Sequence, residues 1–357
     1  MPYLRDIRLS LLCAWADVDL DDEDFMLLYG LNKSKNDYPY WRFDRFDLDK
    51  LDDAEAWTSF RFFKNDIRRL QEVLQIPDEF RTYNRMVVDG TEALCMLLKR
   101  FAYPCRYADL VPHFGRAVPD YSIIVNAVID HIYGQFSHLL TDFNHPMYAV
   151  PKLEEYCLAI KNRGAPLDNC FGFVDGTVRP ITRPGRNQRT VYNGHKKVHA
   201  LKFQSIALPT GIIGHLFGPI EGRRHDCFLL RQSNLLTDLS RFAFNANREA
   251  LCIYGDPAYP LRVHLQSPFQ NPVLNPLQKE FNTRMSKVRV SVEWLFGDIA
   301  NWFAFIDFKK NLKIGLSCVG KMYLICALLK NAKTCLYGCM TSDYFDCEPP
   351  ELEDYFV

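Results

Sequence analysis

Three acidic residues in the second half of the chain stand where folding could bring them together. Asp175 ends the apolar run Cys170–Val174, and Asp256 follows the apolar run Leu251–Tyr254. Glu293 lies in a predicted helix, beside the face that its apolar spacing marks as buried. A carboxylate directly after a buried strand is costly unless something holds its charge. Carboxylates with few nitrogen ligands nearby favour Mg²⁺ or Mn²⁺ over zinc.

Two such ions about 3.5–4 Å apart can activate a water or a 3′-hydroxyl and stabilise the leaving oxygen of a phosphodiester. We therefore interpret Asp175, Asp256 and Glu293 as catalytic metal ligands. Each acid alone has a plainer and stronger explanation, since the two aspartates could begin turns and the glutamate could be a paired surface acid. Together they favour a metal site, because each falls where one site would need it.

Two further residues could support this site. Asp226 follows Arg223-Arg224-His225 and is either the N-cap of a helix over Asp226–Leu239 or a fourth metal ligand, and one residue can fill both roles. Arg289 precedes Glu293 by four residues, one helical turn, so it can steady that carboxylate or contact a phosphate.

A basic stretch without any acid lies between the first two predicted strands and runs into the second. Its cations are Arg183, Arg186, Arg189, Lys196, Lys197 and Lys202. Six positive charges beside a metal-holding strand suit the phosphate backbone of a nucleic acid. The plainer explanation is a solvated basic hairpin. We predict that the six residues, together with Arg289, contact DNA.

The formal net charge of zero hides an uneven distribution. Residues 1–60 hold 14 acidic against 7 basic residues, and residues 342–357 hold 6 acidic residues and no basic one. The remaining centre is therefore basic, which suits a protein that handles a polyanion through its middle. Solvated, partly disordered flanks explain the acidic ends equally well, and both explanations can hold.

The second half alternates predicted strands and helices. The expected strands are Cys170–Val174, Val198–Leu208, Ile212–Phe217 and Leu251–Tyr254, and the expected helices are Asp226–Leu239, Pro276–Phe303 and Ile314–Leu336. Three strands, a helix, a strand and then helices is the order of a ribonuclease-H-like α/β fold, with a mixed sheet and flanking helices. Such a fold holds carboxylates at the carboxyl ends of neighbouring strands.

The first half is predicted to be helical. Helices over Gly90–Tyr103, Arg106–Phe114 and Asp120–Leu140 have a helix-turn-helix outline, although small packing bundles share it. The third helix begins without a cation, which argues against direct reading of a DNA groove. We divide the chain into an acidic, aromatic-containing segment (1–59), a helix-turn-helix-like domain (60–165), a ribonuclease-H-like nuclease domain (166–340) and an acidic tail (341–357).

The composition indicates an intracellular protein without membrane contact. No apolar run approaches the roughly 18 residues that span a bilayer. The apolar run Leu9–Ala16 is followed by acids, unlike a secretory leader. The twelve cysteines are scattered and form no Cys-x-x-Cys pair, so we expect reduced thiols in the core.

The ordered motifs resemble the DDE transposase superfamily and, within it, the PIF/Harbinger group, which includes host genes derived from Harbinger transposases. The matching pieces are FVDGT at 173–177, YNGHKKVH at 192–199, His225-Asp226, GDPAYP at 255–260, Phe281-Asn282, Arg289 and Val292-Glu293. The resemblance covers about residues 170–300 and is looser in the helical half. It implies Asp175, Asp256 and Glu293 as the metal-binding triad of a ribonuclease-H-like fold, and it favours Asp226 as a ligand. The loop Val178-Arg179-Pro180 departs from the family pattern, which leaves the substrate contacts open.

The expected function is Mg²⁺- or Mn²⁺-dependent cleavage of DNA, with strand transfer as an option. A rival from another class is a domesticated DNA-binding or scaffold protein without turnover, and a third candidate is a metal-dependent ribonuclease on the same fold. The resemblance further implies a separate Myb-like DNA-binding partner protein. We expect the nucleus as the location, with the cytoplasm as the alternative, and self-association is left open.

Overall fold

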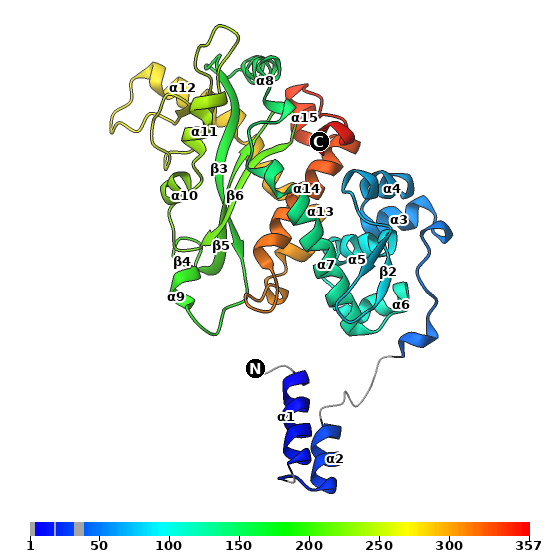
Figure 1. The fold of residues 1–357 in the computed structure, drawn as a ribbon. Coiled ribbons are helices and arrows are strands. Elements are labelled where there is room, and N and C mark those ends of the chain that lie inside the picture. The colour runs from blue at the N-terminus through cyan, green and yellow to red at the C-terminus, as the bar shows by residue number, and fades with distance from the viewer. Residues whose placement is uncertain (1–3, 18, 32–38) are drawn as a thin grey trace.

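The computed structural model describes residues 4–17, 19–31 and 39–357 (Figure 1). Its N-terminal part contains the helices α1 (Leu4–Ala16), α2 (Asp22–Leu31), α3 (Asp53–Phe60) and α4 (Lys64–Val73) and the 3-10 helices η1 (Tyr40–Arg42) and η2 (Leu48–Lys50). Two short strands, β1 (Glu79–Arg81) and β2 (Val87–Asp89), pair antiparallel. The helices α5 (Gly90–Ala102), η3 (Tyr107–Leu110), α6 (Val111–Phe114), α7 (Val118–Phe136), η4 (Ser137–Leu140), η5 (Pro146–Tyr148) and α8 (Val150–Asn162) follow.

The second part contains the large sheet and its helices. The strands are β3 (Cys170–Pro180), β4 (Tyr192–Asn193), β5 (Val198–Ala207), β6 (Ile213–Glu221), β7 (Cys252–Tyr254) and β8 (Leu265–Gln266). The helices are α9 (Gln188–Val191), α10 (Asp226–Gln232), α11 (Leu235–Phe242), α12 (Pro276–Arg289), α13 (Ser291–Trp302), η6 (Ala304–Asp307), η7 (Lys309–Asn311), α14 (Val319–Tyr337), α15 (Met340–Phe345) and α16 (Leu352–Tyr355).

The sheet is mixed, with strand order β6-β5-β3-β7-β8, and the short β4 pairs with β5. β5 pairs antiparallel with both β3 and β6, whereas β7 runs parallel to β3 and β8 runs parallel to β7. The predicted β5–β6 hairpin is confirmed. Its turn closes through the Gly211 N–H on the Leu208 carbonyl at 2.9 Å, with Gly211 at φ +77°. That backbone angle is open to glycine and strained for other residues.

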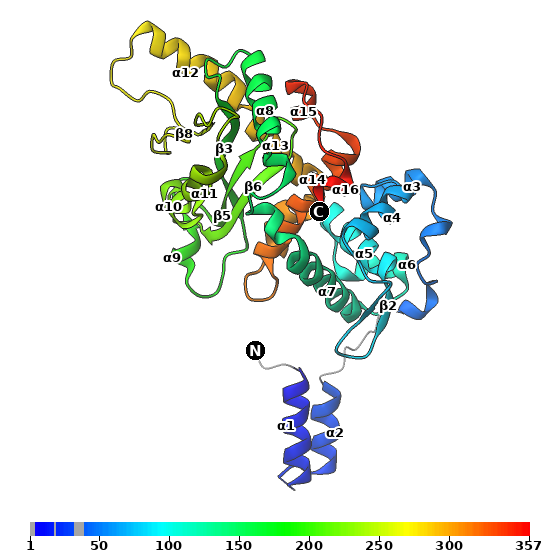
Figure 2. The ribbon, with the colours of Figure 1, turned by 45° about the horizontal axis from the view of Figure 1, so that its top comes forward.

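Helices α13 and α14 lie between the sheet and the helical first half (Figures 1 and 2). The centre of α14 is fully buried and contacts β6 on one side and α7 on the other. β6 is an edge strand, and Asn331 of α14 covers part of that edge. Its Oδ1 accepts from the Ile213 N–H at 2.8 Å, and its Nδ2 donates to the Ile213 carbonyl at 3.0 Å. A helix side chain thereby supplies hydrogen bonds that a further strand would otherwise make.

The predicted helices of the first half are present, with α7 closing in η4 rather than continuing to Leu140. Gly115 ends α6 at φ +60°, and the next residue, Arg116, forms a buried two-pronged ion pair with Glu92 of α5 at 2.7 and 2.6 Å. The apolar stripe of α7 packs against α5 and α14. A DNA-contacting role for these helices therefore stays a prediction, and the stripe itself serves packing.

Several predicted boundaries differ from the observed ones. The helix expected over Asp226–Leu239 is two helices, because Asn234 adopts φ 53° between α10 and α11. The helix expected over Pro276–Phe303 is likewise divided, at Val290. The helix expected from Ile314 begins at Val319. Local apolar spacing cannot detect the break at Asn234, which a single backbone angle produces.

The two acidic ends of the chain differ from each other. The interpretation of the C-terminal end as a solvated flank is wrong for its apolar residues, since Leu352 and Tyr355 are fully buried and Phe345 lies near Phe173 of β3. In the N-terminal segment, α1 and α2 pack on each other and stand apart from the other helices in both views (Figures 1 and 2). Residues 1–3, 18 and 32–38 of that segment lie outside the described residues.

Candidate active site

Asp175 and Asp256 occupy equivalent places on two neighbouring parallel strands. Phe173 of β3 is paired with Tyr254 of β7, and each aspartate follows its paired residue by two positions. The parallel register therefore brings together two acids that are 81 residues apart in the chain. Asp256 follows the end of β7 as predicted, whereas the predicted strand end at Val174 is wrong, because β3 continues past Asp175 to Pro180 in its pairing with β5.

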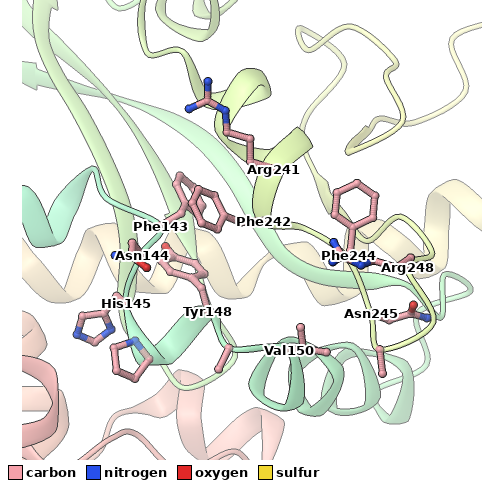
Figure 3. A pocket seen from close by; sticks show the side chains of 13 residues that line it. Phe143, Asn144, His145, Tyr148, Val150, Arg241, Phe242, Phe244, Asn245 and Arg248 are labelled. Atoms are coloured by element: carbon pink, nitrogen blue, oxygen red, sulfur yellow. The ribbon is translucent and has the colours of Figure 1, made fainter.

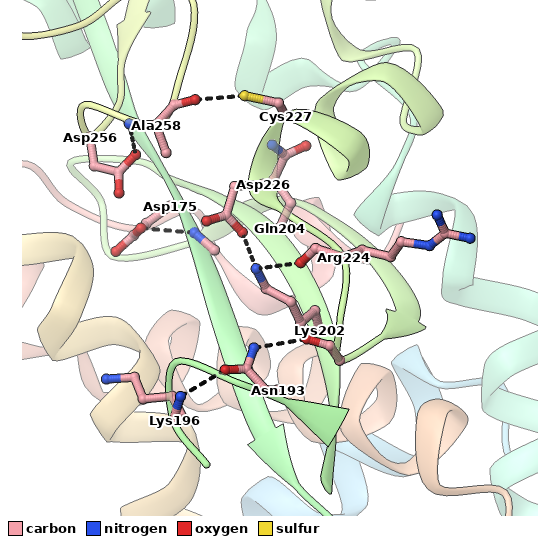
Figure 4. A network of polar contacts seen from close by, with 12 residues as sticks. Asp175, Asn193, Lys196, Lys202, Gln204, Arg224, Asp226, Cys227, Asp256 and Ala258 are labelled. Atoms are coloured by element: carbon pink, nitrogen blue, oxygen red, sulfur yellow. Dashed lines mark hydrogen bonds and ion pairs between the residues drawn. The ribbon is translucent and has the colours of Figure 1, made fainter. Parts of the chain in front are cut away.

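Asp226, the first residue of α10, completes this group. Asp175, Asp226 and Asp256 line one pocket, whose other walls come from residues 192–196 and 222–225 and from Lys202 of β5. Figure 4 shows the three carboxylates close together at one end of the polar network. The N-cap assigned to Asp226 is wrong: His225 holds that position, and it makes no side-chain capping bond.

The pocket is electrostatically costly for its acids. The pKa of Asp175 is raised to about 6, mainly by burial and also by the charges of Asp256 and Asp226, although Arg289 and the Gly176 N–H act to lower it. The Gly176 N–H donates to Asp175 Oδ1 at 2.8 Å. Burial and Asp226 also raise the pKa of Asp256, which accepts the Ala258 N–H at 3.0 Å. Three acids that disfavour one another's charge form a group that a cation would stabilise.

Lys202 is buried, unlike the other five cations of the basic stretch. Its side chain is only 7% exposed, and its ammonium donates to Asp226 Oδ1 at 2.5 Å and to the Arg224 carbonyl at 3.1 Å. The side chain enters the pocket because β5 alternates its residues between the two faces of the sheet. In the structure described, this ammonium lines the pocket and is paired with Asp226, and a DNA contact by Lys202 stays a prediction.

Glu293 stands apart from the three aspartates. Its side chain is 62% exposed and lines a neighbouring pocket with Asp298, Asn301 and Lys330. The expected burial of Val292, Leu295 and Phe296 on the same helix is confirmed. Arg289 links the two places, with its guanidinium 3.5 Å from Asp175 Oδ2 and 3.8 Å from Glu293 Oε1. Glu293 is thus linked to Asp175 through Arg289 and not by a direct contact.

The other five cations of the basic stretch are exposed. Arg183, Arg186 and Arg189 lie before or within α9, and Lys196 and Lys197 lie in the turn between β4 and β5. Lys196 lines the pocket itself. The sequence singled out this turn by its charge, but it gave no weight to Asn193, which is buried and fixes the turn. Asn193 donates to the Gly222 carbonyl at 2.8 Å and accepts the Lys196 N–H at 2.8 Å (Figure 4).

Two other residues near the acids, Tyr259 and Gln204, were not predicted as site residues from the sequence. Tyr259 is fully buried, and its hydroxyl accepts from Gln204 Nε2 of β5 at 3.1 Å. Burial raises the pKa of Tyr259, and all three aspartates raise it further, which locates its hydroxyl within their field. The signal for Tyr259 was its place in the GDPAYP motif. Gln204 is followed by Ser205 in a mostly apolar strand and belongs to no motif that marks it.

Two histidines that the sequence left as ordinary polar residues differ in place. His225 is exposed and lines the acidic pocket, so it is a candidate contact for whatever binds there. His264 is buried, and its Nδ1 lies 2.8 Å from the Leu251 carbonyl, a structural role outside the pocket.

The donor set suits a hard divalent cation. Asp175, Asp226 and Asp256 offer carboxylate oxygens, the ligands that Mg²⁺ and Mn²⁺ prefer. Two of these acids are paired with cations of the protein, Asp226 with Lys202 and Asp175 with Arg289. As placed, no set of three or more His, Cys, Asp or Glu within residues 4–17, 19–31 and 39–357 is arranged to hold a metal ion. The carboxylates are therefore ligands of the type that a divalent metal prefers, and Lys202 and Arg289 are paired with two of them.

A second pocket lies away from the acids and contains none of the predicted site residues. Phe143, Tyr148, Phe242 and Phe244 supply its aromatic walls, with Arg241 and Arg248 at its edge (Figure 3). Phe143 contacts Tyr148, Phe242 and the buried His215 through its ring. Separately, none of the helices in the described part of the chain has the length and apolar composition that crossing a bilayer requires.

Comparison with known families agrees with this geometry. Residues 174–331 match the family described as DDE superfamily endonuclease. The matched region begins one residue before Asp175 and includes Asp226, Asp256 and Glu293. It supports a DDE transposase-like family for this part of the chain, with endonuclease as its general activity and a mixed α/β fold of the corresponding kind. No curated protein and no solved structure shows significant similarity to the chain.

Proposed function

We propose that the chain is a divalent-metal-dependent DNA endonuclease of the DDE transposase type, similar to the PIF/Harbinger group. The observation that carries the proposal is the equivalent placement of Asp175 and Asp256 on parallel strands, with Asp226 in the same pocket. The match of residues 174–331 to DDE endonucleases supports the same reaction. The strand order β6-β5-β3-β7-β8, antiparallel on one side of β3 and parallel on the other, supports a ribonuclease-H-like domain.

In this proposal Asp175 and Asp256 hold the metal, Asp226 assists, and Glu293 approaches from α13. The bound metal would activate a water or a 3′-hydroxyl and stabilise the leaving oxygen of the phosphodiester. Arg289 favours the charged form of Asp175 and helps to hold it in place, since its guanidinium lies 3.5 Å from that carboxylate. The exposed cations Arg183, Arg186, Arg189, Lys196 and Lys197 contact the phosphate backbone beside the pocket.

The partners and the location follow from the proposed reaction and from the family resemblance. We propose DNA as the substrate, the nucleus as the main location, and a Myb-like protein as a partner that helps to bind DNA. Self-association is part of the same proposal. The first turn of α7 carries Asp120 and no cation, so a partner protein would supply the DNA contacts that this turn lacks.

The proposal is tested by nicking of supercoiled plasmid DNA by the full chain in Mn²⁺ or Mg²⁺. We expect Asp175→Asn and Asp256→Asn each to reduce the nicking rate by at least about 100-fold, because each removes a charged ligand. Glu280→Gln is the matched control, since Glu280 is exposed and pairs with Arg284 at i,i+4. Equal nicking by wild type and Asp175→Asn would contradict the proposal. A preference for RNA in parallel assays would reassign the substrate.

A second candidate is a domesticated DNA-binding or scaffold protein without turnover. The ion pairs of Asp226 with Lys202 and of Asp175 with Arg289 favour it, as does the exposure of Glu293, which is linked to Asp175 through Arg289. Calorimetry distinguishes the candidates. Binding of Mn²⁺ that is lost in Asp256→Asn supports the nuclease, whereas DNA binding without any Mn²⁺ binding supports the scaffold.

A further inference from the structure

Lys202 and Asp226 form an ion pair inside the acidic pocket, and this pair bears on how many metal ions the pocket accepts. The side chains are 7% and 24% exposed, and the Lys202 ammonium lies 2.5 Å from Asp226 Oδ1. The Arg224 carbonyl, at 3.1 Å, accepts a second hydrogen bond from the same ammonium. The lysine is therefore held at both acceptors and is part of the folded interior.

Asp226 is held on its other side by the main chain of β3. A β-carbon built on Gly176 would come within 2.5 Å of Asp226 Oδ1 and 2.9 Å of its Cγ. The carboxylate is thus confined between the Gly176 backbone and the Lys202 ammonium. Asp226 is not the N-cap of α10. His225 occupies that position, and it makes no side-chain capping bond. The ion pair is then the main contact that fixes this acid.

The charges in direct contact with the three aspartates nearly cancel theirs. Asp175, Asp226 and Asp256 bring three formal negative charges, while their ion-pair partners Lys202 and Arg289 bring two positive ones. The pocket walls also carry Lys196 and Arg223, which are exposed, and Arg224, which pairs with Glu221. Lys202 also acts on Asp256. Burial and the charge of Asp226 raise the pKa of Asp256, and the charge of Lys202 lowers it. One divalent cation suits the remaining charge, and two would leave a large excess of positive charge at short range.

From this geometry we propose that Lys202 is a positioning residue that keeps Asp226 out of metal coordination, so that the DNA-free protein binds a single divalent ion between Asp175 and Asp256. The inference rests on the proposed metal-dependent function and adds to it. Lys202 takes the place beside Asp226 that a second ion would need. Entry of a second ion then requires further negative charge, which the phosphates of a bound strand carry.

The experiment counts Mn²⁺ ions bound to the full chain without DNA, by equilibrium dialysis and calorimetry. We expect a single ion for wild type. Lys202→Met removes the ammonium and keeps the apolar stem, so Asp226 becomes free to coordinate and a second Mn²⁺ should bind. The double variant Lys202→Met/Asp226→Asn should return to a single ion, because the gain depends on the Asp226 charge. Circular dichroism checks that each variant is folded.

Each outcome decides something. A second ion in wild type, or no gain in folded Lys202→Met, overturns the inference and leaves the proposed nuclease standing. If Lys202→Met does not fold, the double variant decides, since a loss of the wild-type ion there would show Asp226 to be a ligand. Absence of Mn²⁺ binding in wild type and in the variants overturns the metal-dependent function together with the inference.

Discussion

Gly176 lies against Asp226 so closely that a β-carbon on the glycine would be 2.5 Å from the aspartate Oδ1. Gly176 follows Asp175 in β3 and is not in a backbone region that requires glycine. Its side-chain hydrogen is therefore required by the neighbouring carboxylate and not by a turn. The Asp-Gly pair, which in sequence looks like a turn signal, belongs to the packing of the acidic pocket.

Gly176→Ala is expected to destabilise the protein by about 1–3 kcal/mol, because the Lys202 ion pair prevents Asp226 from moving away cheaply. Urea denaturation measures the change. Gly185→Ala is the control, since nothing lies within 4 Å of a β-carbon at Gly185. Equal stability of the two variants would show that Asp226 yields without cost.

Lys196 and Lys197 are expected to contact phosphates directly, because both are exposed in the turn beside the pocket. In the double variant Lys196→Gln/Lys197→Gln, the slope of log affinity against log salt concentration should become shallower by about 2. Fluorescence anisotropy with a labelled DNA duplex measures this slope. The control pair Lys152→Gln/Lys161→Gln lies on α8. A slope that changes only in the α8 variant would locate the DNA surface elsewhere.

Asn331 is expected to be the side chain on which the edge of the sheet most depends. Asn331→Leu leaves both Ile213 main-chain groups without their side-chain partner, and it also removes the 2.7 Å hydrogen bond to Tyr355. The expected loss is about 3 kcal/mol in the free energy of unfolding. Tyr355→Phe removes only one of these bonds and should cost about 1 kcal/mol. A smaller loss for Asn331→Leu than for Tyr355→Phe would reject this ranking.

His215 of β6 should make the protein less stable in acid. Complete burial lowers its pKa to about 4, whereas the unfolded chain binds the proton near the ordinary value of 6.5. The unfolded state thus holds more protons between these values, and stability falls as the pH drops through this window. The full contribution, about 3 kcal/mol, is present above pH 6.5 and is lost as the pH falls toward 4.

His215→Phe should therefore flatten the fall in stability between pH 6.5 and 4, as measured by urea denaturation across that range. The phenyl ring keeps the contact with Phe143. His195→Gln, at an exposed position in the turn after β4, serves as the control and should follow wild type. An unchanged fall in His215→Phe would mean that other groups cause it.

Much of the fold is encoded locally in the sequence. Mostly apolar runs predicted β3, β5, β6 and β7, and helical spacing predicted α5, α7 and α14, because burial along one element depends mainly on its own residues. Asp175 and Asp256 were likewise visible in the sequence, since each follows an apolar run, although β3 continues beyond Asp175. The break between α10 and α11 was not visible, because one positive φ at Asn234 produces it.

The tertiary structure decided which charges meet. The parallel register of β3 and β7 placed Asp175 beside Asp256, and the face of β5 on which Lys202 falls turned a predicted DNA contact into the partner of Asp226. The helical turn after Val290 left Glu293 exposed, with Arg289 between it and Asp175. A sequence determines which side chains are charged and which elements carry them. The charge that each one faces depends on strand register and on helix packing, which are set by contacts between distant segments.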